Sequence, residues 1–80
     1  MNFTVFSKDG CPACTKVKKV LELTESKFVV YNLDEHFDKK AFYDEFGFGS
    51  TFPQVVCDGK TLGGSVETVE FLRERKIIGG

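Results

Sequence analysis

The sequence predicts an α/β protein in which a four-stranded mixed sheet is flanked by helices in the order βαβαββα. Short segments with alternating or nearly continuous apolar residues are typical of strands, and three other segments repeat apolar residues at the steps expected of helices. A glycine pair and two Asp-Gly steps separate several of these segments. The length of 80 residues fits a single domain over residues 1–80, with helices available to cover both faces of the sheet.

The first half of the chain predicts a strand, a helix and a second strand. Residues 2–7 alternate apolar with polar side chains, and the strand that they predict ends before Gly10. Residues 28–33 are nearly all apolar, which predicts a short buried strand. Between these strands the apolar positions recur at three- and four-residue steps, typical of an amphipathic helix: Cys14, Val17, Val20, Leu21 and Thr24.

A short second helix is predicted after a polar loop. Asp38 is the candidate N-cap, since a carboxylate at this position accepts hydrogen bonds from the first free N–H groups of a helix. Phe42 and Phe46 lie four residues apart and therefore on one face. Gly47 and Gly49 are expected to end the helix.

A hairpin and a last helix complete the chain. Strands over residues 54–57 and 60–62 are joined by Asp58-Gly59, a strong signal for a two-residue hairpin turn. Gly63-Gly64 ends the second of these strands, and Ser65 is the expected cap of the last helix. Acidic and basic residues suit the two ends of this helix dipole: Glu67 in the first turn, and Arg73, Arg75 and Lys76 near the end.

Composition excludes several classes of function. Eleven Lys and Arg against 12 Asp and Glu give a formal charge of −1, so a nucleic-acid binder is not expected. The longest apolar run, residues 28–31, is far shorter than the roughly 20 residues of a membrane span. No secretory signal precedes the first strand, so we expect a soluble, monomeric, cytoplasmic protein. In a reducing compartment, three cysteines indicate redox chemistry or metal binding.

The segment Cys11-Pro12-Ala13-Cys14, which carries two of the three cysteines, lies where the first predicted strand passes into the first predicted helix. Cys11 falls near the N-cap and Pro12 at the first helical position, where its missing N–H has no cost. A helix N-terminus can lower a cysteine pKa from about 8.5 to roughly 3.5 to 7.5, which makes Cys11 a candidate nucleophile. Lys8 would add positive charge nearby. Cys14, one turn later, is the candidate resolving thiol that displaces a mixed disulfide on Cys11.

The alternative interpretation of this pair is half of a zinc site. His36 and Cys57 could complete a set of three cysteines and one histidine. No second closely spaced ligand pair exists, and the strand-to-helix context favours redox chemistry. Cys57 lies within an apolar strand and is expected to fill the core, whereas His36 is expected in a solvated loop. The phenylalanines are expected in the core.

Three motifs in order resemble those of the glutaredoxin family. Lys8 with Cys11-Pro12-Ala13-Cys14 is similar to the family's Lys-x-x-Cys-Pro-Tyr-Cys site. Thr51-Phe52-Pro53 is similar to its Thr-Val-Pro segment, and Gly63-Gly64-Ser65 to the glycine pair before its last helix. The likeness covers essentially the whole chain and implies the thioredoxin fold. Thioredoxin itself is less similar, because the chain has no Trp and its motif is Cys-Pro-Ala-Cys.

The resemblance implies a glutathione site beside the two catalytic cysteines. Pro53 would be cis, so that the backbone of Phe52 could hold the cysteinyl part of glutathione like an added strand. N–H groups at the start of the last helix would receive the γ-glutamyl carboxylate, and Lys8 would face the glycyl carboxylate. The implied glutathione-binding residues are Lys8, Pro12, Ala13, Thr51, Phe52, Pro53, Gly64, Ser65 and Val66, with Cys11 and Cys14 catalytic and no metal.

Two departures from the family pattern bear on glutathione affinity. Ala13 replaces the usual Tyr, which removes a ring beside the glutathione sulfur. Val66 replaces the usual Asp, which removes an acceptor for the γ-glutamyl ammonium. Weaker saturation by glutathione is the expected consequence.

The expected function is therefore that of a dithiol glutaredoxin with glutathione as reductant. It would reduce protein disulfides and glutathione mixed disulfides, and ribonucleotide reductase is a frequent partner of the family. One alternative is a thioredoxin-like electron donor reduced by thioredoxin reductase. Others are a zinc or iron-sulfur module using Cys11, or a non-catalytic adaptor.

Overall fold

The computed structural model describes residues 1–75, so the predicted role of Lys76 at the end of the last helix lies outside the described residues. The predicted order βαβαββα is confirmed, and β2 begins and ends one residue earlier than predicted. Within residues 1–75 no helix combines the length and apolar character needed to cross a bilayer. The elements are β1 (Asn2–Ser7), α1 (Pro12–Leu23), β2 (Lys27–Asn32), α2 (Lys39–Phe46), β3 (Gln54–Cys57), β4 (Lys60–Gly63) and α3 (Ser65–Glu74).

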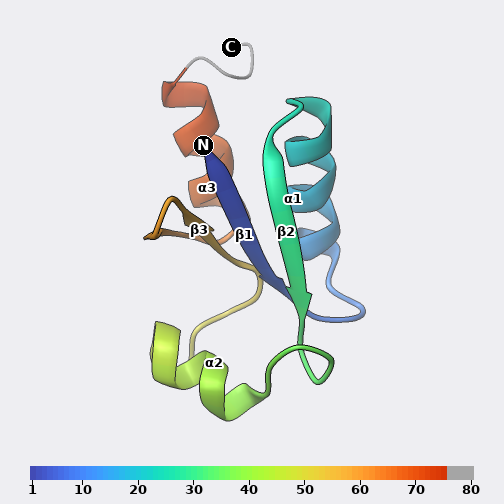
Figure 1. Cartoon of the computed structure of the whole chain (residues 1–80), viewed down its shortest axis with the longest axis vertical. Coiled ribbons are helices and arrows are strands. Elements are labelled where there is room, and N and C mark those ends of the chain that lie inside the picture. Colours follow the sequence, from blue (N-terminus) through green and yellow to red (C-terminus); the bar gives the residue numbers. More distant parts are fainter. Residues whose placement is uncertain (76–80) are drawn as a thin grey trace.

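The four strands form one mixed sheet in the order β2-β1-β3-β4, with β1 and β2 side by side in Figure 1. β1 runs parallel to β2, from Asn2 opposite Lys27 to Ser7 opposite Asn32. β3 pairs antiparallel with both β1 and β4. Asp58 and Gly59 have φ angles of 48° and 85°, the paired positive values of a type I′ turn, so the predicted hairpin is confirmed.

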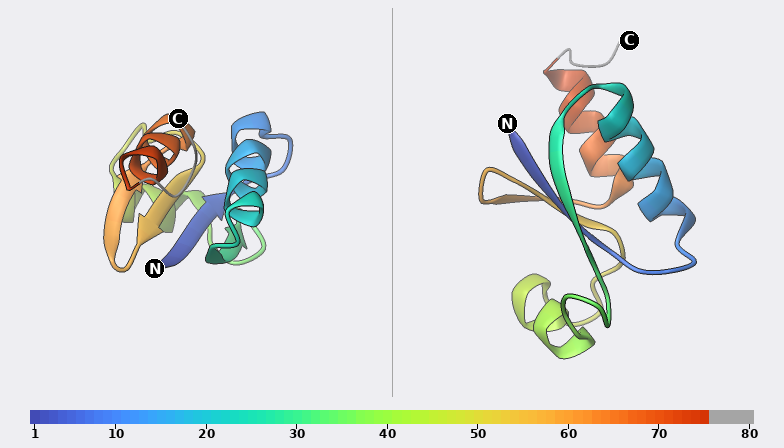
Figure 2. Two further views of the ribbon diagram at one scale, coloured as in Figure 1. Left: turned by 90° about the horizontal axis from the view of Figure 1, so that it is seen from above. Right: turned by 45° about the vertical axis from the view of Figure 1, so that its right-hand side comes forward.

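The main core lies between one face of the sheet and the helices α1 and α3, which pack on the same side of it (Figure 2). Three of the predicted apolar positions of α1 are buried there, because they share one helical face: Cys14, Val17 and Leu21. The side chains that we call the main core are Phe3, Val5, Val17, Leu21, Val55, Cys57 and Leu72.

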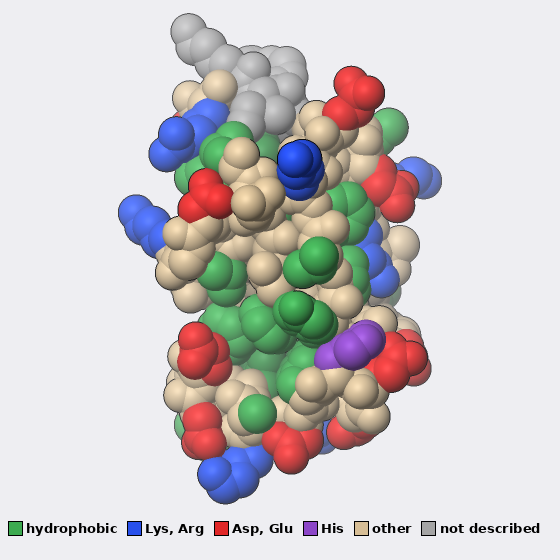
Figure 3. All heavy atoms as spheres, in the orientation of Figure 1, with side chains coloured by type: hydrophobic (Ala, Val, Ile, Leu, Met, Phe, Trp, Pro, Cys, Tyr) green, Lys and Arg blue, Asp and Glu red, His purple; other side chains and the backbone are tan. Residues whose placement is uncertain are grey.

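The second face of the sheet is largely open, and here two predictions are wrong. β2 is an edge strand rather than a buried one, with Val29 51% and Tyr31 41% exposed. Helices do not cover both faces: α2 lies at one end of this face, where Phe46 meets Phe6 with ring centroids 5.0 Å apart, and leaves Val29 and Tyr31 exposed. Figure 3 shows hydrophobic side chains gathered across the middle of this open surface.

A second group of side chains, the aromatic cluster, packs around α2. Asp38 caps this helix as predicted, its Oδ1 accepting from the N–H of Ala41 at 2.8 Å. Gly47 ends it, also as predicted. The expectation that the phenylalanines all belong to the core is wrong, because Phe48 is 96% exposed and five others form this separate group. The cluster consists of Phe6, Phe37, Phe42, Phe46 and Phe52.

Candidate active site

Cys11 and Cys14 form a disulfide at the start of α1. Cys11 is the N-cap residue with extended backbone, and Pro12 is the first helical residue, as the sequence predicts. The Cα atoms of the two cysteines are 5.2 Å apart, within the usual range for a disulfide. The backbone N–H of Cys14 donates to the Sγ of Cys11 at 3.2 Å. This donor, at the positive end of the helix, stabilises negative charge on the Cys11 sulfur.

The two sulfurs differ in accessibility. Cys14 is only 1% exposed, whereas Cys11 is half-buried and lines an open groove. A substrate disulfide can therefore reach Cys11 first. This asymmetry is what the predicted roles require, namely an accessible nucleophile and a covered second thiol.

Lys8, which lines a groove together with Cys11, also contacts Phe52. The Nζ of Lys8 lies 5.2 Å from the centroid of the Phe52 ring, a cation–π contact. The ring of Phe42 is stacked on that of Phe52 with centroids 4.1 Å apart and planes at 9°, and Phe37 is stacked on it at 6.3 Å. The Phe52-Pro53 bond is cis, which confirms that prediction. No pattern in the sequence indicates that Phe42, on α2, supports this loop.

The start of α3 differs from its prediction. Gly64, not Ser65, is the N-cap residue. The Oε1 of Glu67 accepts from the Gly64 N–H at 2.7 Å, and the reciprocal bond of a capping box is missing because glycine has no side chain. One of the N–H groups expected to receive the γ-glutamyl carboxylate is thus bound by a carboxylate of the chain itself. The sequence pattern predicts for Glu67 only an interaction with the helix dipole.

Of the other residues predicted to bind glutathione, Gly64 and Pro53 lie close together. A Cβ on Gly64 would be 3.5 Å from the carbonyl oxygen of Pro53, so the Pro53 loop and the start of α3 are in close contact. Val66 is 60% exposed at the first turn of α3. Ala13 is half-buried and Thr51 is exposed, with the Thr51 carbonyl accepting from the Nε2 of Gln54 at 2.9 Å.

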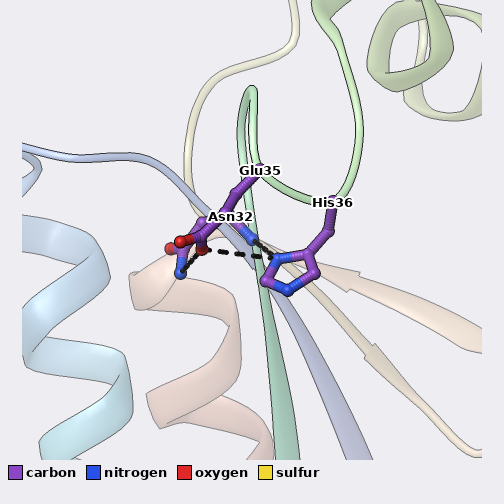
Figure 4. A network of polar contacts seen from close by, with 3 residues as sticks. All are labelled: Asn32, Glu35 and His36. Atoms are coloured by element: carbon purple, nitrogen blue, oxygen red, sulfur yellow. Dashed lines mark hydrogen bonds and ion pairs between the residues drawn. The ribbon is translucent and has the colours of Figure 1, made fainter.

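A groove that Lys8 and Cys11 both line opens towards the end of β2. Its volume is about 490 Å³. At its edge Asn32 ends β2 and joins the turn that follows, shown in Figure 4: the Asn32 N–H donates to the Nδ1 of His36 at 3.0 Å, and its Nδ2 donates to the Oε2 of Glu35 at 3.3 Å. The lining residues are Lys8, Asp9, Gly10, Cys11, Pro12, Thr15, Lys18 and Asn32.

The alternative zinc set is not brought together. His36 is engaged by the turn after β2 through its Nδ1, while Cys57 is 6% exposed within the main core, as expected of a core-filling cysteine. Burial, and then the charge of Asp58, raise the pKa of the Cys57 thiol, which keeps it protonated and a poor nucleophile. Residues 1–75 contain no group of three His, Cys, Asp or Glu side chains placed to hold a metal ion.

Comparison with known proteins places this geometry in a family. The glutaredoxin family model matches residues 3–62. A glutaredoxin of Vernicia fordii is 36% identical over 77 residues, covering 92% of this chain and 74% of the relative. The buckwheat glutaredoxin-glutathione complex has a TM-score of 0.78 at 30% identity, covering 94% of this chain and 71% of that chain.

Reduced Escherichia coli glutaredoxin gives a TM-score of 0.81 over 98% of this chain and 100% of that chain. At 20% identity this likeness shows the fold alone, and it confirms the thioredoxin-like fold. The matched residues 3–62 include both cysteines at the start of α1 and the Phe52-Pro53 loop. From this match, and from the disulfide in its strand-to-helix position, we conclude that the chain belongs to the glutaredoxin family.

Proposed function

We propose that this protein is a glutathione-dependent thiol-disulfide oxidoreductase that reduces protein disulfides and glutathione mixed disulfides. The observation that carries the proposal is the Cys11–Cys14 disulfide at the start of α1, with Cys11 facing an open groove and Cys14 covered. Membership of the glutaredoxin family supports it, as does similarity to a glutaredoxin solved with glutathione bound.

The reaction begins with the reduced protein. The Cys11 thiolate attacks one sulfur of the substrate disulfide, so that a mixed disulfide forms on Cys11 and the other substrate sulfur leaves as a thiolate. Cys14, once deprotonated, then attacks Cys11, which releases the second substrate thiol and closes the Cys11–Cys14 disulfide. Two glutathione molecules supply the two electrons that reopen it and become glutathione disulfide. When Cys11 itself is glutathionylated, a second glutathione can release it without Cys14.

Glutathione would lie on the Phe52 side of Cys11. The Phe52 backbone would pair with its cysteinyl part, and Lys8 would attract its glycyl carboxylate. At the start of α3, the γ-glutamyl carboxylate would bind the N–H groups of Ser65 and Val66, because Glu67 already occupies that of Gly64. Competition from this internal carboxylate is a further reason to expect weak saturation by glutathione.

The substitution Val66→Asp tests this placement of glutathione. Because Val66 is 60% exposed, the new carboxylate can reach the γ-glutamyl ammonium without disturbing the core. We expect the KM for glutathione to fall by about two- to fivefold, the value of one exposed ion pair. Val66→Asn, of the same shape without the charge, is the control and should leave KM near that of the wild type. An unchanged KM in Val66→Asp would count against the placement.

NADPH consumption with glutathione, glutathione reductase and a small mixed disulfide tests the function itself. Cys11→Ser should abolish turnover, since the nucleophile is lost. Cys14→Ser should retain turnover if glutathione releases Cys11 directly, and lose it if the dithiol route is required. An inactive wild type would refute the glutathione assignment, and coupling to thioredoxin reductase would then be the function to test.

A further inference from the structure

The groove extends from Cys11 towards β2, whereas the proposed glutathione site extends towards the Phe52-Pro53 loop, and Lys8 belongs to both because it lines the groove and contacts the Phe52 ring. β1 leads into the Cys11 loop, and its two neighbours in the sheet are β2 and β3. Asn32, at the end of β2, lines the groove, whereas Pro53 directly precedes β3. A ligand in the groove and glutathione on the Pro53 side would therefore approach Cys11 from different directions.

One stripe of α1 forms a wall of this groove. Cys11, Thr15 and Lys18 are spaced by four and three residues, so they follow one another along a single helical face. Side chains on a helix tilt towards its N-terminus, which directs the Lys18 side chain back towards Cys11. Lys18 is half-buried, in contrast to its exposed neighbour Lys19.

Lys18 supplies the unpaired positive charge of the groove that glutathione would leave free. It forms no ion pair with a carboxylate among residues 1–75, where Lys40 does so with Asp44. Lys8 also lines the groove, but its ammonium is the one that we assign to the glycyl carboxylate of glutathione. Asp9 lines the groove as well, and Glu35 lies at its β2 edge, bonded to Asn32. A carboxylate bound in the groove would therefore pair with Lys18 itself.

We propose that this groove binds an acidic side chain of the protein substrate close to the cysteine that is being reduced. The proposal rests on the proposed function: if the glutathione half of a mixed disulfide lies on the Phe52 side, the protein half must extend towards β2. Lys18 lies six residues beyond Pro12, about 9 Å along the helix axis. An extended peptide covers this distance in about two to three residues, so the acidic residue belongs within that distance of the cysteine.

Single-turnover kinetics with two matched peptides test the subsite. Both peptides carry one cysteine joined to glutathione, and they differ only in having Asp or Asn two residues from it. Prereduced protein is mixed with each peptide, and release of the peptide thiol is followed. We expect the wild type to react about three- to fivefold faster with the Asp peptide at low ionic strength. This ratio of the two rates, the Asp-to-Asn ratio, should fall as salt is added. Both peptides share the glutathione half, so the effect of its carboxylates on the rate is the same for both and cancels in the ratio.

Variants of the lysines assign the preference to the groove. Lys18→Gln should lower the Asp-to-Asn ratio to about one, whereas Lys19→Gln, an exposed neighbour outside the groove, should keep the wild-type ratio. Asp9→Asn removes the opposing charge and should raise the ratio. A loss of folded protein, or of reactivity of the Cys11 thiol, slows the reaction with both peptides equally and therefore leaves the Asp-to-Asn ratio unchanged.

Two results would overturn the proposal. One is a wild-type ratio of one at low salt, and the other is a preference that survives Lys18→Gln unchanged. The single turnover needs neither glutathione reductase nor free glutathione. Release of neither peptide thiol would refute the proposed function, whereas release of both at equal rates would refute the subsite alone, so the two failures are separate outcomes.

Discussion

The main core and the aromatic cluster differ in how they are buried. Phe3, Val5 and Leu21 of the main core are at most 1% exposed, whereas the most buried ring of the cluster, Phe42, is 2% exposed and its neighbours are only half-buried. The main core holds α1 and α3 on the sheet. The cluster holds Phe52, and through it Lys8, beside the nucleophile. Stability of the fold and geometry of the site thus depend on largely separate side chains.

The largest effect on stability should come from Leu21→Ala in the main core. Loss of a fully buried leucine side chain leaves a cavity and should lower the free energy of unfolding by about 2–5 kcal/mol, measured by urea denaturation. The matched control is Leu23→Ala in the same helix, because Leu23 is 77% exposed. Its effect should stay within about 0.5 kcal/mol. Equal losses in the two variants would contradict the assignment of the main core.

Phe42→Leu should affect stability less and activity more. Loss of the ring stacked on Phe52 should lower the free energy of unfolding by about 1–2 kcal/mol. Since Phe52 then no longer fixes the ammonium of Lys8, kcat/KM for a mixed disulfide should fall by about two- to fivefold. Val17→Ala in the main core is the comparison, since it destabilises the fold without touching Phe52. If both variants lost activity equally, the separation of the two regions would be wrong.

Glu67→Ala should have the smallest effect. It removes the acceptor of the Gly64 N–H at the start of α3, and should lower the free energy of unfolding by about 0.5–1 kcal/mol. Glu67→Gln retains an acceptor oxygen and should lose less than half of this amount. Thermal unfolding of the two variants distinguishes the hydrogen bond from a general effect of charge. A loss as large as that of Leu21→Ala would show that α3 depends on its cap more than on the main core.

The features that could be predicted from the sequence are those set by the residues of a single helix, strand or turn. The helical spacing of Val17 and Leu21 predicts the buried face of α1, and Asp58-Gly59 predicts the hairpin, because each pattern reports its own local geometry. The position of Cys11 at a strand-to-helix junction likewise predicts its place as N-cap residue.

The features that could not be predicted depend on competition or on distant partners. The apolar residues of β2 form the same sequence pattern whether the second face of the strand is covered or exposed. Ser65 is a good cap by type, but Glu67 bonds the preceding residue instead. The support of Phe52 by Phe42 and the wall that Asn32 adds beside Lys18 join separate elements, which no local pattern reports.

The attachment of α2 has a consequence for the opening motions of the molecule. Three residues of α1 are buried, whereas in α2 Phe42 alone is buried. Segments with few buried contacts open at a lower free energy than the whole protein unfolds. Backbone amides of α2 should therefore exchange with solvent earlier than those of α1. The support beneath Phe52 can then detach and re-form while the sheet, α1 and the cysteine pair remain folded.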